Sequence, residues 1–238
     1  MFCPRCQKPQ DDGLEECVHC GVVFSRYRPR PRPEEREPSW LEERMFHIGP
    51  SGDRGLVAVR GAFLVLLGIV TLWVLLLPMQ GPRLIGSFLH WIDLPFHEAG
   101  HVVFSPLGTF LQILGGTLGQ LLVPLLVAGV FLKQDNPFGA SAGAWWLGQS
   151  LMDCAPYIAD ARVRQLLLTT GETGQTDWEG HDWFQLLSRT GLLLHDVRIA
   201  RLFWLAGAGL MLAALAWGGY IVWKQWGPGT GGTERAPS

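Results

Sequence analysis

Two histidines and a glutamate near the middle of the chain have the spacing of a zinc hydrolase site. Glu98 directly follows His97, and His101 comes three residues later. Residues four apart on a helix lie one turn apart on the same face, so both imidazoles could bind one Zn²⁺. Zinc lowers the pKa of a bound water toward about 7, and Glu98 would take the proton as general base. The pattern predicts peptide hydrolysis without a covalent intermediate.

The third zinc ligand must come from another segment. Asp153 is our first candidate, because it recurs with Gln149 and Tyr157 at helical spacing and makes a polar stripe that we expect to face the metal. His181 and Asp182, in the loop that follows, are the competing candidates. The sequence leaves this choice open.

Two further polar residues precede the histidines on the same predicted helix. Asp93 lies one turn before His97 and could hold its imidazole, and His90 lies about one turn before Asp93. The alternative is that His90 and Asp93 form a hydrogen-bonded pair at the membrane interface.

Four cysteines at the N-terminus predict a second zinc site. They form two Cys-x-x-Cys pairs separated by a short loop, the arrangement of a tetrahedral zinc ribbon over residues 1–25. A segment this short cannot bury a core, so the metal would supply most of its folding energy. The alternative is a pair of disulfides. The predicted ligands are Cys3, Cys6, Cys17 and Cys20.

Composition places the chain among membrane proteins. Hydrophobic residues make up 48% of it, charged residues only 17%, and there are eleven tryptophans. The net charge of −2 argues against nucleic acid as a partner. The N-terminus opens with cysteines and not with the basic and apolar stretches of a secretory signal. We expect an all-α polytopic membrane protein with about five transmembrane helices and a small N-terminal zinc ribbon.

The expected organisation follows from hydropathy and charge. A Pro/Arg-rich charged linker and membrane approach covers 26–60, the transmembrane domain 61–226 and a flexible tail 227–238. Gly115 and Gly119 predict close helix packing. Basic residues gather before the first span and between the last two, which puts the N-terminus in the cytoplasm. The predicted spans are 61–78, 84–103, 109–132, 138–161 and 202–223.

The motifs resemble the site-2-protease family of intramembrane zinc metallopeptidases. The likeness covers roughly residues 61–200 and rests on the His-Glu-x-x-His motif in a membrane helix, the glycine-rich helix after it and Asp153 two helices on. It implies that His97, His101 and Asp153 bind zinc and that Glu98 is the general base. Substrates would be helices of other membrane proteins. The context Leu-Met-Asp-Cys-Ala-Pro departs from the family's usual Leu-Asp-Gly or Asn-Pro segment.

Other functions are compatible with the same residues. A non-proteolytic membrane scaffold or sensor would use both zinc sites structurally and recruit a protein through the ribbon. A hydrolase acting on a small or lipid substrate would share the catalytic residues. The loop over 163–196 could be a lid over the site or an interfacial connector.

Overall fold

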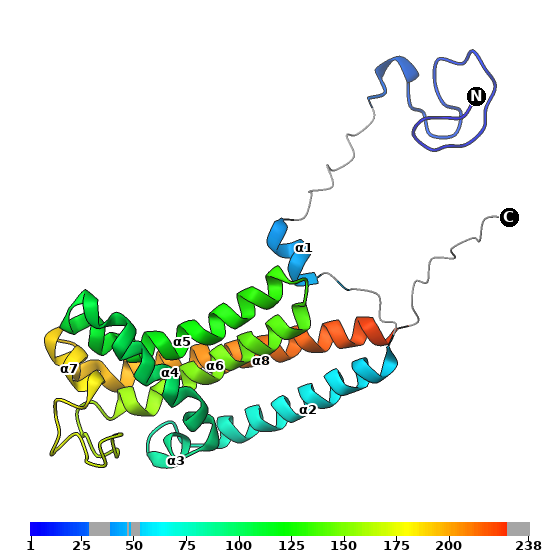
Figure 1. Ribbon diagram of the computed structural model, residues 1–238. Helices are drawn as coiled ribbons and strands as arrows, with labels where there is room; N and C mark the ends of the chain where they lie inside the picture. The colour runs from blue at the N-terminus through cyan, green and yellow to red at the C-terminus, as the bar shows by residue number, and fades with distance from the viewer. Residues whose placement is uncertain (29–38, 47, 49–52, 228–238) are drawn as a thin grey trace. The chain divides into compact units, whose positions relative to one another are not determined.

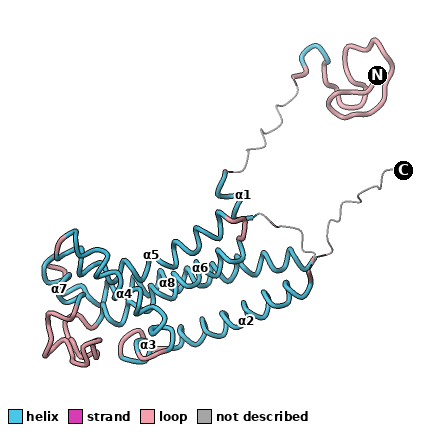
Figure 2. The backbone as a smooth tube through the Cα atoms, in the orientation of Figure 1, coloured by secondary structure: helices cyan, strands magenta, loops and turns pink. Residues whose placement is uncertain are grey.

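A computed structural model describes residues 1–28, 39–46, 48 and 53–227, and in these ranges the chain is helical with isolated β-bridges and no strands (Figure 1, Figure 2). It divides into two compact units, Met1–Ser39 and Trp40–Ser238. Most of the proline-rich part of the predicted linker, 29–38, and nearly all of the predicted tail, 228–238, lie outside the described residues.

The first unit consists of two similar turns, each built around one Cys-x-x-Cys pair. An isolated bridge closes each turn, Phe2 with Pro9 and Glu16 with Val23. Within the first turn the N–H of Gln7 donates to the carbonyl of Cys3, and Gly21 and Cys17 repeat this bond in the second at 2.8 Å. Gln7 and Gly21 both have positive φ angles, 58° and 64°. A short 3₁₀ turn, η1 (Phe24–Arg26), follows.

The second unit contains eight α-helices among its described residues. Two 3₁₀ turns, η2 (Ser105–Leu107) and η3 (Leu193–His195), join neighbouring helices. The α-helices are α1 (Trp40–Phe46), α2 (Arg54–Leu76), α3 (Pro82–Ile85), α4 (Phe88–Phe104), α5 (Thr109–Lys133), α6 (Pro137–Ala159), α7 (Asp182–Arg189) and α8 (Asp196–Trp226). Helix α1 and the first turns of α2 therefore fall within the range predicted as linker.

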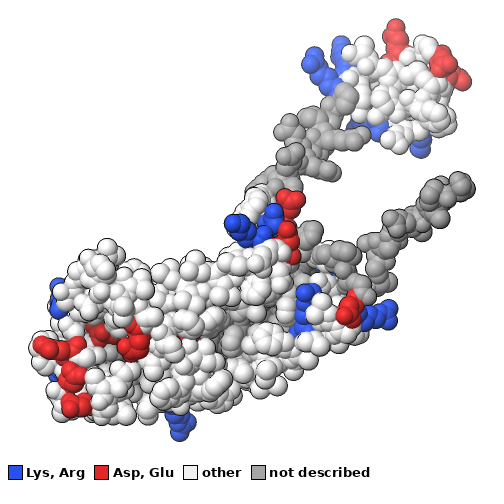
Figure 3. All heavy atoms as spheres, in the orientation of Figure 1, with Lys and Arg blue, Asp and Glu red and all other residues white. Residues whose placement is uncertain are grey.

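Three helical segments of the described chain are long and apolar enough to cross a membrane: α2, α5 and the stretch Leu193–Trp226 that contains α8. The predicted count of five spans is not confirmed. The other two predicted spans correspond to α4, which has 17 residues, and to α6, which has 23 but carries several polar side chains. On the face in Figure 3, most charged residues lie toward the two ends of this unit, and the surface between them carries few charged side chains.

Helix α6 forms the centre of the bundle. Most of its residues are buried, and it packs against α5 and along α8 (Figure 1). Helix α2 packs against α8 and also contacts α6, where Trp145 donates to the hydroxyl of Thr71 at 2.8 Å. Two glycines allow the α6–α8 contact: a Cβ on Gly207 would lie 2.5 Å from the carbonyl oxygen of Gly148, and the reverse distance is 2.8 Å. The backbones therefore meet where neither residue has a side chain.

Helices α4 and α5 form a hairpin that also depends on glycine. The backbone of Gly100 lies against Gly115 and Gly119, so that a Cβ on any of the three would overlap the facing helix. The predicted close approach at Gly115 and Gly119 is confirmed. This contact brings the histidine-bearing turn of α4 against α5.

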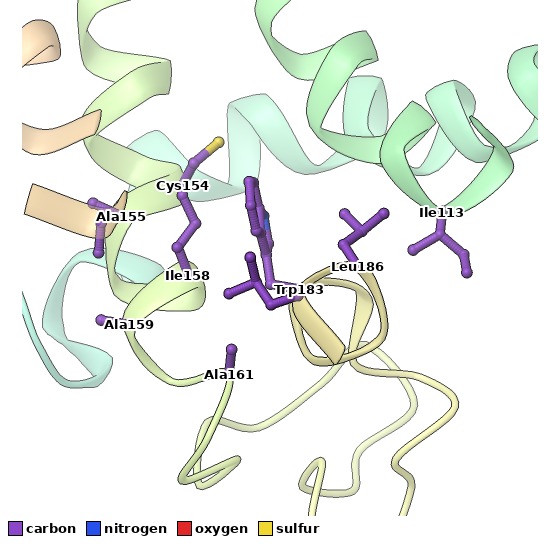
Figure 4. Close-up of a cluster of buried hydrophobic side chains, with 10 residues drawn as sticks. Ile113, Cys154, Ala155, Ile158, Ala159, Ala161, Trp183 and Leu186 are labelled. Atoms are coloured by element: carbon purple, nitrogen blue, oxygen red, sulfur yellow. The ribbon is translucent and has the colours of Figure 1, made fainter. Parts of the chain in front are cut away.

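Helix α7 is short and amphipathic, and its apolar face docks against the bundle. Trp183 and Leu186 are buried and lie in one cluster with Ile158 and Cys154 of α6 and Ile113 of α5 (Figure 4). The imidazole Nδ1 of His181 accepts a hydrogen bond from the N–H of Phe184 at 3.2 Å and caps the helix. Docking and capping together fix where α7 begins.

The α6–α8 contact predicts opposite effects for two glycines of one helix. In a helix, Gly→Ala alone stabilises by roughly 1 kcal/mol. We expect that gain for Gly209→Ala, where the added methyl meets open space. Gly207→Ala should instead destabilise by about 1–3 kcal/mol, because the methyl overlaps Gly148. Thermal unfolding of the detergent-purified protein measures both, and an equal rise in melting temperature would contradict the contact.

Candidate metal centres

The four N-terminal cysteines converge on one point. Their sulfurs all lie within 4.8 Å of one another, with Cys3 and Cys20 3.8 Å apart and Cys6 and Cys17 3.7 Å apart. Four sulfurs at 2.3 Å from a central zinc ion have tetrahedral edges of about 3.8 Å, whereas a disulfide requires about 2.05 Å. The five cysteines of the chain are accordingly free thiols here.

Backbone N–H groups support two of these sulfurs. Arg5 donates to the Sγ of Cys3 and His19 to the Sγ of Cys17, both at 3.4 Å. Such bonds stabilise thiolates, the form in which cysteine binds metal. The cluster can therefore hold a metal ion, as the sequence predicts.

A second group forms where α4 meets the start of α7. His97, His101 and Asp182 each offer one ligand atom within 4.8 Å of the others. The Oδ2 of Asp182 is 3.0 Å from the Nε2 of His97 and 3.3 Å from the Nε2 of His101. Ligands at about 2.0–2.1 Å from a tetrahedral zinc are separated by about 3.3–3.4 Å, so these distances fit a shared ion.

The other ring nitrogens decide what this group can bind. Nδ1 of His101 lies 2.8 Å from the carbonyl oxygen of Gln112, which can only accept, so Nδ1 carries the proton. Nδ1 of His97 faces the amide oxygen of Gln120 at 3.2 Å in the same way. Each neutral imidazole then directs the lone pair of Nε2 at the carboxylate of Asp182. Three electron-rich atoms facing one another are stabilised by a cation between them.

Helix α5 leaves room for such an ion. Gly116 faces the two imidazoles, and a Cβ at this position would lie 2.5 Å from the Nε2 of both His97 and His101. The glycine therefore provides the space that the ligand atoms require. In the sequence Gly116 belongs only to the glycine-rich pattern, but in the structure it is part of the site.

Glu98 lies at the same cavity. The cavity has a volume of about 240 Å³ and is open on one side, and Glu98 is exposed in its wall beside both histidines. Leu166 to Thr170, from the loop between α6 and α7, line it as well. The metal group, the predicted general base and the predicted lid segment thus share one cavity.

Tyr157 and His181 hold Asp182 in place. The hydroxyl of Tyr157 accepts from the N–H of Asp182 at 2.9 Å and donates to the carbonyl of Gly180 at 3.3 Å, and its ring stacks on His181. Burial alone would raise the pKa of the Asp182 carboxyl. In the metal-free site, hydrogen bonds from His101 and His97, when these imidazoles also carry a proton on Nε2, outweigh burial and keep the pKa below its usual value. The carboxylate is therefore the stable form, and a metal ion would replace those two protons.

The first candidate for third ligand, Asp153, lines the same cavity but lies outside the group formed by His97, His101 and Asp182. Asp153 is buried, and its Oδ2 accepts from Nε2 of Gln120 at 2.9 Å and from Nδ1 of His90 at 2.8 Å. The structure does not bring its carboxylate into the group formed with His97. Of the alternatives left open by the sequence, Asp182 is the one whose carboxylate lies beside both histidines, while His181 caps α7.

Asp93 also has partners other than those expected. Its Oδ1 accepts from the indole of Trp146 at 2.7 Å and from the hydroxyl of Ser150 at 3.3 Å. The predicted support of His97 is provided instead by Gln120. The sequence signal for this role was a glutamine in the middle of a largely apolar helix, since polar groups at such positions are costly and usually functional.

Comparison with known proteins identifies no relative: no family model, no curated protein and no solved structure matches the chain. The resemblance to site-2 proteases therefore rests on the sequence motif alone.

The space at Gly116 predicts a specific loss of metal. Gly116→Ala should remove the metal bound by the histidines, because the methyl occupies the position in front of both Nε2 atoms. Gly129→Ala is the matched control, since a Cβ at that position of α5 meets open space. Zinc per purified chain measures the effect: about one ion fewer for the Gly116 variant and no change for the control. Full zinc retention by Gly116→Ala would contradict the site.

The ribbon can be tested by the same measurement. Cys17→Ser should remove one zinc ion and make the first unit sensitive to protease, because the metal supplies most of its folding energy. Cys154→Ser, at the buried cysteine of α6, should keep every zinc ion. Equal zinc contents in the two variants would exclude the ribbon site.

Proposed function

We propose that this protein is an intramembrane zinc metallopeptidase that cuts peptide bonds of membrane-embedded substrate helices. The observation that carries the proposal is the convergence of His97, His101 and Asp182 in a cavity that also contains Glu98. Two imidazoles and one carboxylate leave the fourth position of a tetrahedral zinc open, as in catalytic and not in structural sites.

The residues divide the chemistry among them. When bound, zinc supplies Lewis acidity, which activates a water molecule and polarises the carbonyl of the scissile bond. Glu98 takes the proton of the attacking water and passes it to the leaving amine. The carbonyl of Gln112 and the amide of Gln120 hold the imidazoles in the tautomer that leaves each Nε2 free.

The membrane setting supports a substrate that is itself within the bilayer. Helix α5, which faces the histidines, is one of the three segments able to span. A cavity beside such a helix is reached more readily by a membrane segment than by a soluble protein. We place the protein in the cell membrane as a multi-pass protein, with the N-terminus in the cytoplasm where thiols stay reduced.

The ribbon fits recruitment of a protein partner. It forms a compact unit separate from the helices, and Phe2 and Val18 remain exposed on it. Apolar side chains around a rigid metal-held turn are a common basis for protein contacts.

Glu98→Gln tests the proteolytic function. Loss of the general base should lower cleavage about 10²–10⁴-fold while both zinc ions are retained, because the amide cannot accept the proton. Glu179→Gln, at an exposed position of the α6–α7 loop, is the control.

The readout is a survey of new protein termini in membranes of cells that produce each variant. Termini inside membrane segments should depend on the unaltered chain or the Glu179 variant and be absent with Glu98→Gln. Identical termini in all three would favour the scaffold or sensor, which needs no general base.

A further inference from the structure

A chain of three hydrogen-bonded side chains connects Asp153 to the metal group. The carboxylate Oδ2 of Asp153 accepts from the Nε2 of Gln120 at 2.9 Å, and the Oε1 of Gln120 faces the Nδ1 of His97 at 3.2 Å. The three residues come from α6, α5 and α4. Each is buried, and all three line the cavity that contains the metal group.

The carboxylate fixes which way the glutamine amide points. An ionised carboxylate only accepts, so Gln120 must present its NH₂ group to Asp153 and its oxygen to His97. The oxygen in turn requires a proton on the Nδ1 of His97, which leaves a lone pair on Nε2. With the amide reversed, Nδ1 would accept and Nε2 would carry the proton, and a protonated Nε2 cannot bind a metal.

His90 holds the carboxylate in this position. Its Nδ1 donates to the same Oδ2 of Asp153 at 2.8 Å, so that one oxygen is held from α4 and from α5. The Asp153 side chain is 1% exposed. Its Oδ1 lies buried without a protein partner, but it is not among the atoms that surround the candidate metal position.

We propose that Asp153 is a positioning residue, which selects the metal-binding tautomer of His97 through Gln120 and does not bind the metal itself. The inference rests on the proposed function of the His97 site. It assigns Asp182 as the third ligand and gives the polar stripe of α6 a role in orienting α4.

Reversing the Gln120–Asp153 bond provides the test. In the double variant Gln120→Glu with Asp153→Asn, the carboxylate introduced at 120 still accepts from His97, and the amide introduced at 153 can donate to it. His90, whose Nδ1 faces the same atom of residue 153, then accepts through Nδ1 in its other neutral tautomer. The chain keeps its shape with donor and acceptor exchanged. Gln120→Glu alone instead sets two carboxylates against each other, and Gln120→Leu or Asp153→Leu removes the bond.

Zinc affinity is measured by chelator competition on the full-length purified protein, with the ribbon ion as an internal reference of one zinc per chain. We expect each single Leu variant to lower the affinity for the second zinc ion about 10–100-fold, as loss of a group that hydrogen-bonds a metal ligand does. The double Leu variant should bind the second zinc ion no more weakly than the weaker-binding single variant, because both substitutions break the same series of hydrogen bonds. The exchanged pair should bind within a few-fold of the unaltered protein.

Each alternative outcome has a distinct meaning. If Asp153 binds the metal, the exchanged pair and Asp153→Asn lose the second zinc as fully as His97→Ala, and the inference is overturned while the proposed site stands. Additive losses in the two Leu variants would overturn it too. If the unaltered protein holds only the ribbon zinc, both the proposed function and this inference fail. Far-UV circular dichroism checks that each variant is folded.

Discussion

Two imidazole nitrogens and a carboxylate oxygen converge inside an apolar helical bundle, and holding them within reach of one ion is the constraint around which the second unit is organised. A cation between them would be attracted to the carboxylate and to the lone pairs of both neutral imidazoles. Every neighbouring group preserves the arrangement: a backbone carbonyl and an amide oxygen keep the outer nitrogens protonated, and Gly116 keeps the inner space free. The helices that carry these groups must therefore approach closely and in one register.

Glycine provides that approach at two separate crossings. Gly100 meets Gly115 and Gly119 between α4 and α5, and Gly148 meets Gly207 between α6 and α8. In lipid, helices gain little from burying apolar side chains against each other, so close backbone packing and buried hydrogen bonds replace the usual driving force. The same contacts that hold the bundle together thus set the distance from the histidines to α5.

The sequence predicts best what depends on local spacing. The two histidines and Glu98 follow from helical geometry, and the four cysteines from the two short turns that contain them. The third member of the histidine group was harder to predict from the sequence. Asp153 has the right helical period, but the period does not fix the depth of the helix in the bundle or its rotation about its axis. Asp182 reaches the site only because Trp183 docks α7 and Tyr157 holds the first residue of that helix.

The number of spans shows the same limit. The sequence-based prediction treats α4 and α6 as transmembrane helices. Neither is among the segments long and apolar enough to span, and both carry buried polar residues that pair with one another, such as Asp93 with Trp146. Several polar side chains of α6 pair with neighbouring helices, whereas the Nε2 of Gln149 and the Oδ1 of Asp153 are buried without a hydrogen-bond partner. Gln120 had no role in the sequence-based prediction because its partners lie on two other helices.

Asp182 is the first residue of the short docked helix α7 and also a member of the candidate metal group. Metal binding at this group and the docking of α7 would therefore be coupled in one equilibrium. The same carboxylate that completes the metal group belongs to the segment that closes the cavity wall, and α7 is attached through a small apolar face. Any ion bound there stabilises the docked α7 in proportion to its free concentration over its dissociation constant. The conformation of this cavity wall would then depend on the concentration of free metal ion.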